Sequence, residues 1–541
     1  MRHFLKILFP ILCVFLSVVQ VQAANWYVRS NGGAYGAENG TDWNNAFDGF
    51  SDITWANGAC GDTIWVAGGR YTQSFSPAKS CTSAAPLSIR RARSDAAECT
   101  SAAGWTTGFD ATVEQYRTTL YFGSYNWITV SGRATASGGG YGWLINFPGV
   151  TAGKGIEFPN GSTGSNIQVE YMEIRGPDIL GFRDDGRAID DTPFTESTNH
   201  TYSHVKISGW ESGIYIAGTH NHVSEYIDMS RIQSDGVMHP NLYYIIGSNN
   251  GVIRHSRFYD SAASGTGIAF SDGGPWNNWT LVGNLFYDMT SAYGTSIGIQ
   301  DAAIVGLKIY NNTFVNTYLN MNLSAASCGS GSETRNNLYY GSGGAIQCGA
   351  TSNNITASSN PFINSGADEY RIIGTVGTNL PRDKGMDLGL SNNVDPDDRI
   401  RGSDGAWDVG AYEFSGASAS DTTPPIIYIT APAAGATASG TAVTVSANAS
   451  DNVGVVGVQF KLDGVNLGSE DTTAPYSVTW STTTASNGSH TLTAVARDAA
   501  GNQTTSLAVA VTVSNVTSST NFILNGTFEA FTSGKANNWT D

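Results

Sequence analysis

Short apolar runs with strand-like composition recur along the middle of the chain at a nearly constant interval. Phe258, Phe286 and Phe314 follow one another every 28 residues, within runs that otherwise align. Each unit carries a second apolar run, such as residues 267–270 and residues 296–299. Helical periodicity is absent from these units, so the pattern predicts an all-β repeat.

The length of the unit decides which kind of repeat is expected. A propeller blade needs four antiparallel strands in about 40 residues, whereas each unit here has about 24 to 33 residues, with Gly, Asn and Ser at the turns. Two or three short strands per unit favour the coils of a parallel β-helix, each stacked on the next. Asn284, Asn312 and Asn337 occupy equivalent places, and we expect their amides to form a hydrogen-bonded ladder.

A change of composition after Phe414 marks a second part of the chain. Residues 416–425 are small and polar and end in two prolines, which is typical of a linker. Residues 426–515 alternate between apolar and polar positions in several short runs, and this spacing predicts a β-sandwich.

The first 23 residues have the features of a secretory signal peptide. Arg2 and Lys6 precede an apolar run at residues 7–19, and small residues before Ala24 offer a cleavage site. A membrane anchor is the alternative, but the run is shorter than the ~20 residues that a span needs. We therefore expect a secreted or cell-surface protein, not inserted in a membrane once the signal is removed.

Charge and cysteine content narrow the function further. The 541-residue chain has a formal charge of −17, which excludes a globally basic, nucleic-acid-binding surface, and any basic site must be local.

Five cysteines remain after the signal, none with zinc-finger spacing. Export permits disulfides. Cys328 and Cys348 are placed to link neighbouring coils, and one further bridge is open among Cys60, Cys81 and Cys99.

Several stretches resemble known families. Residues 26–28, 40–47 and 61–71 resemble the N-terminal cap, and residues 397–414 the closing motif, of secreted right-handed parallel β-helix proteins of the pectin-lyase-like superfamily. This resemblance covers about residues 24–415 and implies a right-handed solenoid. The superfamily includes lyases, hydrolases, epimerases, phage tailspikes and adhesins, so the fold does not give the function.

The C-terminal part carries its own resemblances. The stretches at residues 451–455 and 496–502 resemble bacterial Ig-like modules, which usually act as spacers or adhesive units. Residues 516–541 look like the start of a carbohydrate-binding jelly roll, in which case the chain is cut within a further domain; a frayed tail is the alternative. About twenty residues do not bury a core alone.

One candidate site is a pair of carboxylates. Residues 268–272 align with residues 297–301, which puts Asp272 and Asp301 at the same position of adjacent coils. Two carboxylates side by side can share a proton or a cation, and a glycoside hydrolase needs such a pair. Asp235 is a further candidate partner. The alternative is that both aspartates cap turns.

A second candidate neighbourhood has the residue types of a polysaccharide lyase. His239 offers a base for the proton next to a uronate carboxylate, with Asp235 four residues before it. Arg254 and Arg257 lie one strand later and offer the positive charge that neutralises the carboxylate. A histidine more often serves only as a hydrogen-bonded surface residue.

Two further groups point to ligands. Asp184, Asp185, Asp190 and Asp191 offer oxygen ligands for Ca²⁺, unless they form a solvated loop that Arg183 and Arg187 neutralise. Trp276 and Trp279 stand in a polar turn directly after Asp272. We expect these two rings to be exposed and to stack on sugar rings.

Three functions are consistent with these features. The first is a secreted polysaccharide lyase or glycoside hydrolase that acts on an extracellular glycan in a groove along the solenoid. The second is a non-catalytic adhesin that binds a polysaccharide or a cell-surface glycan, and the third is a structural envelope or fibre component. The enzyme requires Asp, His and Arg to converge in one groove, whereas the adhesin does not.

Overall fold

The computed structural model describes most of the chain between residues 23 and 515. The described residues are 23–30, 32–56, 58–136, 140–149, 153–177, 186–194, 196–232, 241–260, 266–271, 274, 276–289, 296–299, 303–317, 328–342, 345–365, 369–373, 379–389, 393–403, 406–414, 424–451, 454–498 and 501–515. The chain divides into two compact units between Ser415 and Gly416. The predicted signal peptide and jelly-roll segment lie almost entirely outside the described residues.

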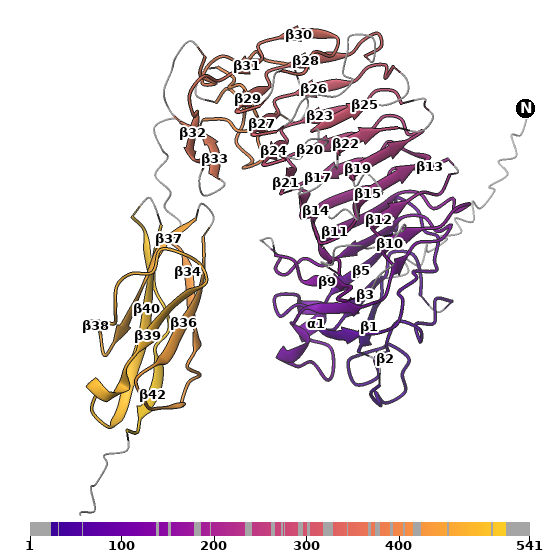
Figure 1. Cartoon of the computed structure of the whole chain (residues 1–541). Coiled ribbons are helices and arrows are strands. Elements are labelled where there is room, and N and C mark those ends of the chain that lie inside the picture. Colours follow the sequence, from indigo (N-terminus) through magenta and orange to yellow (C-terminus); the bar gives the residue numbers. More distant parts are fainter. Residues whose placement is uncertain are drawn as a thin grey trace, which may run out of the picture. The chain divides into compact units, whose positions relative to one another are not determined.

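Two parallel sheets make up most of the first unit (Figure 1). The larger sheet contains β1 (Asn25–Arg29), β2 (Phe47–Asp48), β3 (Thr63–Val66), β4 (Gly69–Tyr71), β5 (Leu87–Arg91), β6 (Val113–Tyr116), β8 (Ile128–Ser131), β9 (Trp143–Asn146), β11 (Ile167–Arg175), β14 (Thr201–Ser208), β17 (Val223–Glu225), β18 (Asp228–Ser230), β20 (Val252–Arg254), β21 (Arg257–Tyr259), β23 (Thr280–Val282), β24 (Leu285–Tyr287), β26 (Lys308–Tyr310), β27 (Thr313–Val315), β28 (Glu333–Arg335), β29 (Leu338–Tyr340), β30 (Ala350–Ser352) and β31 (Ile355–Thr356). The smaller sheet contains β7 (Leu120–Tyr121), β10 (Lys154–Phe158), β12 (Arg187–Asp191), β15 (Ser212–Ala217), β19 (Asn241–Ile246), β22 (Thr266–Phe270) and β25 (Ile297–Ile299).

Short elements complete this unit. The parallel pair β13 (Ser197–Thr198) and β16 (Thr219–His220), the antiparallel pair β32 (Phe362–Asn364) and β33 (Glu369–Ile372), the helix α1 (Ala97–Thr100) and the 3₁₀ turn η1 (Thr107–Phe109) lie beside the main sheets. No helix in the described part of the chain is long and apolar enough to cross a membrane.

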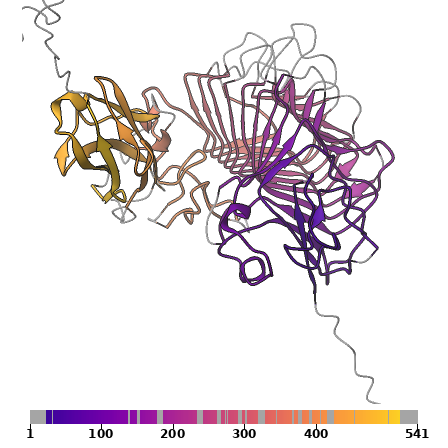
Figure 2. The ribbon, with the colours of Figure 1, turned by 90° about the horizontal axis from the view of Figure 1, so that it is seen from below.

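Each strand of the larger sheet pairs in parallel with its counterpart one coil later. Phe258 pairs with Phe286, which pairs with Phe314, and their stacked ring centroids are 5.0 Å apart at each step. This is the predicted 28-residue repeat, and the first unit is a right-handed parallel β-helix. Figure 2 shows the successive coils stacked in register. Alternating apolar side chains point inward and form one continuous core.

The predicted asparagine ladder is confirmed. Asn284 Nδ2 donates to Asn312 Oδ1 over 3.0 Å, Asn312 Nδ2 donates to Asn337 Oδ1 over 3.1 Å, and Asn337 continues the series to Asn354 over 3.0 Å. The first three of these side chains are fully buried, so the ladder satisfies polar groups that would otherwise lose water without compensation.

Disulfides join neighbouring coils at two places. Cys60 bonds to Cys81 and Cys328 bonds to Cys348, and Cys99 stays a free, buried thiol. The predicted pairing of Cys328 with Cys348 is confirmed. Two disulfides are consistent with an oxidising compartment.

The end of the first unit runs back along one corner of the solenoid. We call residues 379–389, 393–403 and 406–414 the C-terminal strap. Asn353 Nδ2 donates to the Lys384 carbonyl, and Asn336 exchanges two hydrogen bonds with the backbone of Met386. Farther back along the solenoid, Tyr226 Oη donates to Asp398 Oδ1 over 2.7 Å. The predicted closing motif therefore covers a side of the coils.

The second unit is a sandwich of antiparallel sheets with its own core. One sheet holds β34 (Ile426–Ala431), β36 (Val443–Ser450) and β39 (Tyr476–Trp480), and the other holds β35 (Thr437–Ala438), β42 (Val509–Val513), β40 (Gly488–Asp498), β37 (Val455–Leu462), β38 (Val465–Asn466) and β41 (Gln503–Thr505), with the 3₁₀ turn η3 (Thr482–Thr484) between sheets. Val445, Phe460 and Trp480 lie in the core between the sheets. This matches the predicted Ig-like fold.

Candidate functional site

Six of the residues singled out from the sequence lie outside the described part of the chain. These are Asp184, Asp185, Asp235, His239, Asp272 and Asp301. The carboxylate pair and the His239 base therefore stay predictions.

Asp190 and Asp191 lie on β12, and both carboxylates are buried. Lys154 and Arg187 form ion pairs with Asp190, the latter over 2.8 Å. Within the described ranges, no group of three or more His, Cys, Asp or Glu side chains is placed to hold a metal ion. The calcium site stays a prediction, because half of its four aspartates are not described.

Asp191 belongs to a polar network inside the solenoid. His200 Nδ1 lies 2.9 Å from Asp191 Oδ2, and His200 Nε2 lies 2.9 Å from the Gly164 carbonyl. Both nitrogens face acceptors, so His200 is an imidazolium. Burial alone would lower the pKa of His200, but the Asp191 charge raises it above its ordinary value. Tyr202 and Thr219 also donate to Asp191, which closes the network.

Trp276 and Trp279 are buried, so the expectation of exposed sugar-stacking rings is wrong. Their exposed fractions are 1% and 0%. Trp276 Nε1 donates to the Ile245 carbonyl and Trp279 Nε1 to the Ser248 carbonyl. The turn is polar, but the two indoles fold back into the core, and Trp279 packs edge-on against Phe270. An indole ring stabilises the fold more when it is buried in the core than when it stays in water.

Arg254 faces outward on β20 and pairs with a glutamate one coil earlier. Arg254 Nε lies 2.8 Å from Glu225 Oε2, and a second guanidinium nitrogen contacts the same oxygen. Its charge is therefore already neutralised, and its predicted catalytic role is not tested by this contact.

A cavity of about 300 Å³ opens on the larger sheet beside the strap. We call it the strap groove. It is lined by Tyr141, His204, Tyr226, Ile227, Asp228, His255, Ser256, Arg257, Leu285, Arg371, Pro396, Asp397 and Tyr412. Strands β14, β18 and β21 supply one wall, and the strap supplies the other.

A corner with left-handed backbone runs along the strap groove. Tyr171, His204, Tyr226 and His255 have φ between 52° and 56° on four consecutive coils. The first three rings stack, with centroids 4.4 Å apart for Tyr171 and His204 and 4.5 Å for His204 and Tyr226, whereas His255 meets Tyr226 edge to face. Bulky residues rarely adopt this conformation, and such strain clusters at functional sites.

The following coils fill the same corner with residues that suit it. Gly283, Asn311, Asn336 and Asn353 continue the left-handed positions. The strap forms hydrogen bonds with Asn311, Asn336 and Asn353 of this series. Nearer the N-terminus of the solenoid, it forms a hydrogen bond with Tyr226. Of the four aromatic corner residues, Tyr171 and His255 are buried, and only His204 and Tyr226 stay partly exposed.

Hydrogen bonds determine which nitrogen of His204 carries a proton. Ser203 Oγ lies 3.0 Å from Glu225 Oε1 and 2.9 Å from His204 Nδ1. The Glu225 carboxylate, paired with Arg254, can only accept, so the single Ser203 proton goes to Glu225. Ser203 Oγ must then accept from Nδ1–H, and Nε2 keeps its lone pair. Burial lowers the pKa of His204, which keeps the ring neutral near pH 7.

Two cations line the strap groove, of which Arg371 pairs with Glu369 and Asp397, whereas Arg257 does not pair with a carboxylate of the described residues. The Arg257 guanidinium donates to the Tyr287 hydroxyl over 3.1 Å, and its Nε has no hydrogen-bond partner among the described residues. Burial alone would lower the pKa of Arg257, but the neighbouring Tyr287, Tyr412 and Asp228 raise it. A half-buried guanidinium without an ion-paired carboxylate in the described ranges favours an anion from outside.

Two carboxylates line the strap groove, and they differ in their partners. Asp397 accepts from Arg371 Nε over 2.6 Å and from Arg399 over 2.8 Å. Asp228 accepts from the Tyr259 hydroxyl over 2.8 Å and lies next to Arg257 in the strand register. Both carboxylates therefore already lie beside a guanidinium group.

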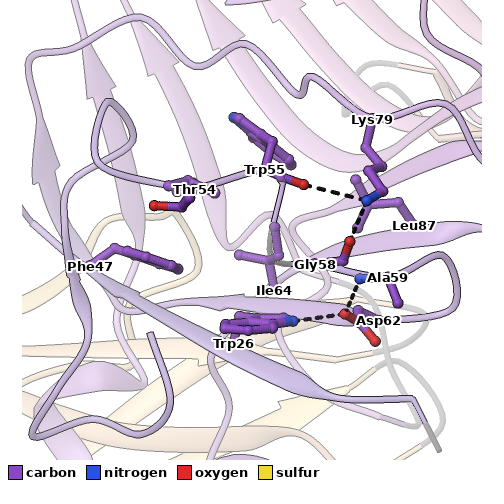
Figure 3. A pocket seen from close by; sticks show the side chains of 11 residues that line it. Trp26, Phe47, Thr54, Trp55, Gly58, Ala59, Asp62, Ile64, Lys79 and Leu87 are labelled. Atoms are coloured by element: carbon purple, nitrogen blue, oxygen red, sulfur yellow. Dashed lines mark hydrogen bonds between the residues drawn. The ribbon is translucent and has the colours of Figure 1, made fainter. Parts of the chain in front are cut away.

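A much smaller cavity lies in the N-terminal cap (Figure 3). Its volume is about 20 Å³, room for about one water molecule. Lys79 Nζ donates to the backbone carbonyls of Trp55 and Gly58, and Trp26 Nε1 donates to Asp62 over 2.8 Å. These bonds tie the cap together and leave no room for a sugar.

The residues that converge in the strap groove were only partly visible in the sequence. Arg257 belonged to the predicted lyase neighbourhood, whereas His204 and Tyr226 were not singled out. Aligning the coils by their turns, instead of by their apolar runs, would have found them. Such an alignment sets Tyr171, His204 and Tyr226 against glycine and asparagine in later coils.

Comparison with known proteins identifies the second unit. Residues 425–494 match the family model of the bacterial Ig domain. The C-terminal unit is a bacterial Ig-like module. A fibronectin(III)-like module of Clostridium thermocellum CbhA is 30% identical, covering 17% of this chain and 97% of that one, with a TM-score of 0.16. No curated protein sequence matches the chain.

The β-helix unit is similar to solved structures at low identity. An alginate lyase from Paenibacillus sp. str. FPU-7 is 11% identical, covering 61% of this chain and 95% of that one, with a TM-score of 0.31. A GH136 lacto-N-biosidase from Eubacterium ramulus is 10% identical, covering 61% and 67%, with a TM-score of 0.36. These values are too low to carry an activity across to this chain.

Proposed function

We propose that this chain is an extracellular protein that acts on acidic polysaccharide, and that it cleaves the glycan by β-elimination in the strap groove. The observation that carries this proposal is Arg257, a half-buried cation without a carboxylate ion pair among the described residues, at the wall of a cavity of about 300 Å³. A uronate carboxylate satisfies such a group. The phenol ring of Tyr141, which is 38% exposed, offers a face for the sugar ring.

The groove supplies each part that β-elimination needs. Arg257 neutralises the uronate carboxylate, which acidifies the proton on the adjacent carbon. The lone pair of His204 Nε2 takes that proton. The electron pair left on carbon forms the new carbon–carbon double bond, and the bond to the leaving glycosidic oxygen breaks. The leaving oxygen takes a proton from Tyr141, whose pKa is raised by desolvation and by Asp228, so that its hydroxyl stays protonated.

The arginines beside the two carboxylates of this groove favour β-elimination over hydrolysis. A hydrolase needs one protonated and one ionised carboxyl group, or a carboxylate nucleophile with an acid partner. Asp397 accepts hydrogen bonds from two arginines, and Asp228 lies beside Arg257, so neither carboxyl group is free to act as the acid or the nucleophile. The predicted pair of Asp272 and Asp301 stays a separate proposal for hydrolysis elsewhere on the solenoid.

A non-catalytic glycan-binding role is the second candidate. It is favoured by the stacked corner rings, which are well placed for binding whether or not a bond is cleaved. The Ig-like module suits either role, since such modules act as spacers or adhesive units. The two disulfides support an extracellular location.

The test uses the mature chain, residues 24–541, and a panel of polyuronates with neutral glycans as controls. We expect absorbance of the unsaturated product to rise with an acidic polymer only. His204→Asn suits the left-handed corner and removes the base, so turnover should fall by at least about a hundredfold while the melting temperature is kept. His490→Asn in the Ig-like module is the matched control. Binding without unsaturated product would instead support the adhesin.

A further inference from the structure

A second cavity opens on the outer face of the larger sheet, nearer the N-terminus than the strap groove. Its volume is about 270 Å³, and we call it the arginine cavity. It is lined by Arg90, Arg91, Arg93, Ser131, Arg133, Ala136 and Glu170. Four arginines at one cavity stand out in a chain that has 28 basic residues against 45 acidic ones. The overall negative charge of the chain allows only a local basic site, and this cavity is such a site.

The arginines of this cavity are unequally neutralised. Arg91 forms an ion pair with Asp110 over 2.6 Å, and Arg93 Nε lies 3.1 Å from Asp95 without a hydrogen bond to a described residue. Arg133 lies 3.8 Å from Glu170, beyond hydrogen-bond distance. The structure gives exposed Arg90 no ion pair within its described residues. The cavity therefore keeps an excess of positive charge and free guanidinium donors.

The arginine cavity and the strap groove lie along one line. Arg90 pairs with Ser131, Ser131 with Glu170, and Glu170 with Ser203, all on the outward side of consecutive strands. Parallel strands repeat every ~4.8 Å, which is close to the length of one sugar in an extended chain. About three strand spacings thus separate Arg90 from the Ser203 that orients His204.

Arg133 joins the two cavities directly. Its guanidinium stacks on the Tyr171 ring at 4.3 Å, and Tyr171 is the first ring of the corner stack that continues to His204. Arg133 also forms a β-bridge with Tyr141, which lines the strap groove. A glycan that leaves the strap groove beside Tyr141 therefore meets Arg133 on its way to the arginine cavity.

We propose that the arginine cavity is a second anionic subsite, which binds a carboxylate or sulfate group of the same polysaccharide chain several sugars away from the strap groove. This inference rests on the proposed function, which places the polysaccharide in the strap groove. It specifies the class of polysaccharide further. The substrate is a polymer with repeated acidic groups, which extends along the solenoid axis. A short acidic oligosaccharide reaches only one of the two cavities.

The test compares a long polyuronate with its disaccharide, which is too short to span both cavities, as substrates of the full mature chain. Arg90→Gln is expected to lower the ratio of kcat/KM for the polymer to kcat/KM for the disaccharide about tenfold, the size of one lost charge-assisted hydrogen bond. Arg70→Gln is the matched control, because Arg70 is 59% exposed and lies outside both cavities. A sulfated polymer run in parallel distinguishes carboxylate from sulfate recognition. An unchanged ratio in Arg90→Gln would overturn the inference.

A binding experiment separates this inference from the proposed function. Polymer is titrated into His204→Asn, with and without Arg90→Gln, at two salt concentrations. We expect Arg90→Gln to weaken binding about tenfold at low salt and less at high salt, where charges are screened. If binding depends on Arg90 but wild type releases no unsaturated product, the subsite stands and the lyase reaction fails. If Arg90→Gln binds as tightly as its parent, the subsite fails whatever the enzyme does.

Discussion

Ser203 Oγ lies between His204 Nδ1, at 2.9 Å, and Glu225 Oε1, at 3.0 Å. This serine transmits the negative charge of Glu225 to the imidazole and leaves Nε2 as the basic nitrogen. Arg254 fixes Glu225 from the next coil. Arg254 is thus a positioning residue for the proposed base, three contacts away from it.

Loss of the glutamate should change the pH profile. Burial lowers the pKa of His204, and Glu225 opposes that shift. Glu225→Gln therefore lowers the pKa of His204 further, and the acidic limb of the pH–rate profile should move to lower pH, with a smaller maximal rate because tautomer control is lost. The matched control is Glu333→Gln, an outward glutamate of the same sheet paired with Arg335 over 3.1 Å. An acidic limb that stays in place would show that the relay does not reach the base.

His255 should make the solenoid sensitive to acid. Burial, then the charges of Arg401 and Arg254, lowers the pKa of His255 to about 4, and Glu225 opposes this. The folded pKa lies below the unfolded value of about 6.5, so this contribution to stability is complete above pH 6.5 and is lost as the pH falls to 4. The shift corresponds to about 3 kcal/mol.

Denaturant unfolding of His255→Asn between pH 7 and 4 checks this expectation. Asparagine suits the left-handed corner, as Asn311 does two coils later. The variant should lose much of the decline in unfolding free energy between pH 6.5 and 4. His490→Asn should keep it, because His490 lies in the separate Ig-like module and its pKa is raised, not lowered, by the hydrogen bond to Asp463. Equal slopes in both variants would exclude His255 as the acid-sensitive group.

Gly283 should tolerate no side chain. Its φ is +66°, and a Cβ there would lie 2.8 Å from His255 Cδ2. Gly389 has a similar φ of +62°, but no atom lies within 4 Å of its added Cβ. Gly389→Ala should cost about 1 kcal/mol for backbone strain alone, and Gly283→Ala about 2 to 3 kcal/mol more, because the imidazole must shift. Thermal unfolding of both variants measures the difference, and equal losses would contradict the steric argument.

Asp191 should stabilise the fold through its hydrogen bonds to the core. Asp191→Asn leaves the buried His200 imidazolium without its counter-charge, at an expected cost of about 3 to 5 kcal/mol. In a second experiment, the melting temperature of the wild-type protein is measured with and without a chelator. A melting temperature unchanged by chelator would place Asp191 in the polar network alone, whereas a drop that Ca²⁺ restores would support the predicted calcium site.

Much of the architecture was readable from the sequence because solenoid coils repeat locally. The spacing of Phe258, Phe286 and Phe314 predicted the strand register, and Asn284, Asn312 and Asn337 predicted the ladder that the structure contains. Each of these residues meets its equivalent on the next coil, so one periodicity determines both partners. The Ig-like module followed from its own short alternating strands.

The candidate site was less predictable because it depends on directions and long-range contacts. Trp276 and Trp279 stand in a polar turn, and only the path of the backbone turns their indoles into the core. The strap groove brings Tyr141, His204 and Arg371 together from segments far apart in the chain. No local pattern relates residues at such separations.

The sequence by itself determined the repeat, the inward face of each strand, the buried amide ladder and the division into a solenoid and a sandwich, because all four follow from side-chain period and local turn chemistry. The tertiary structure alone decided where chemistry converges. The strap lies back along the corner, where Tyr226 donates a hydrogen bond to Asp398, 172 residues later in the chain. The groove then lies between the strap and the partly exposed His204 and Tyr226. Non-local packing selects which outward residues remain open to a ligand.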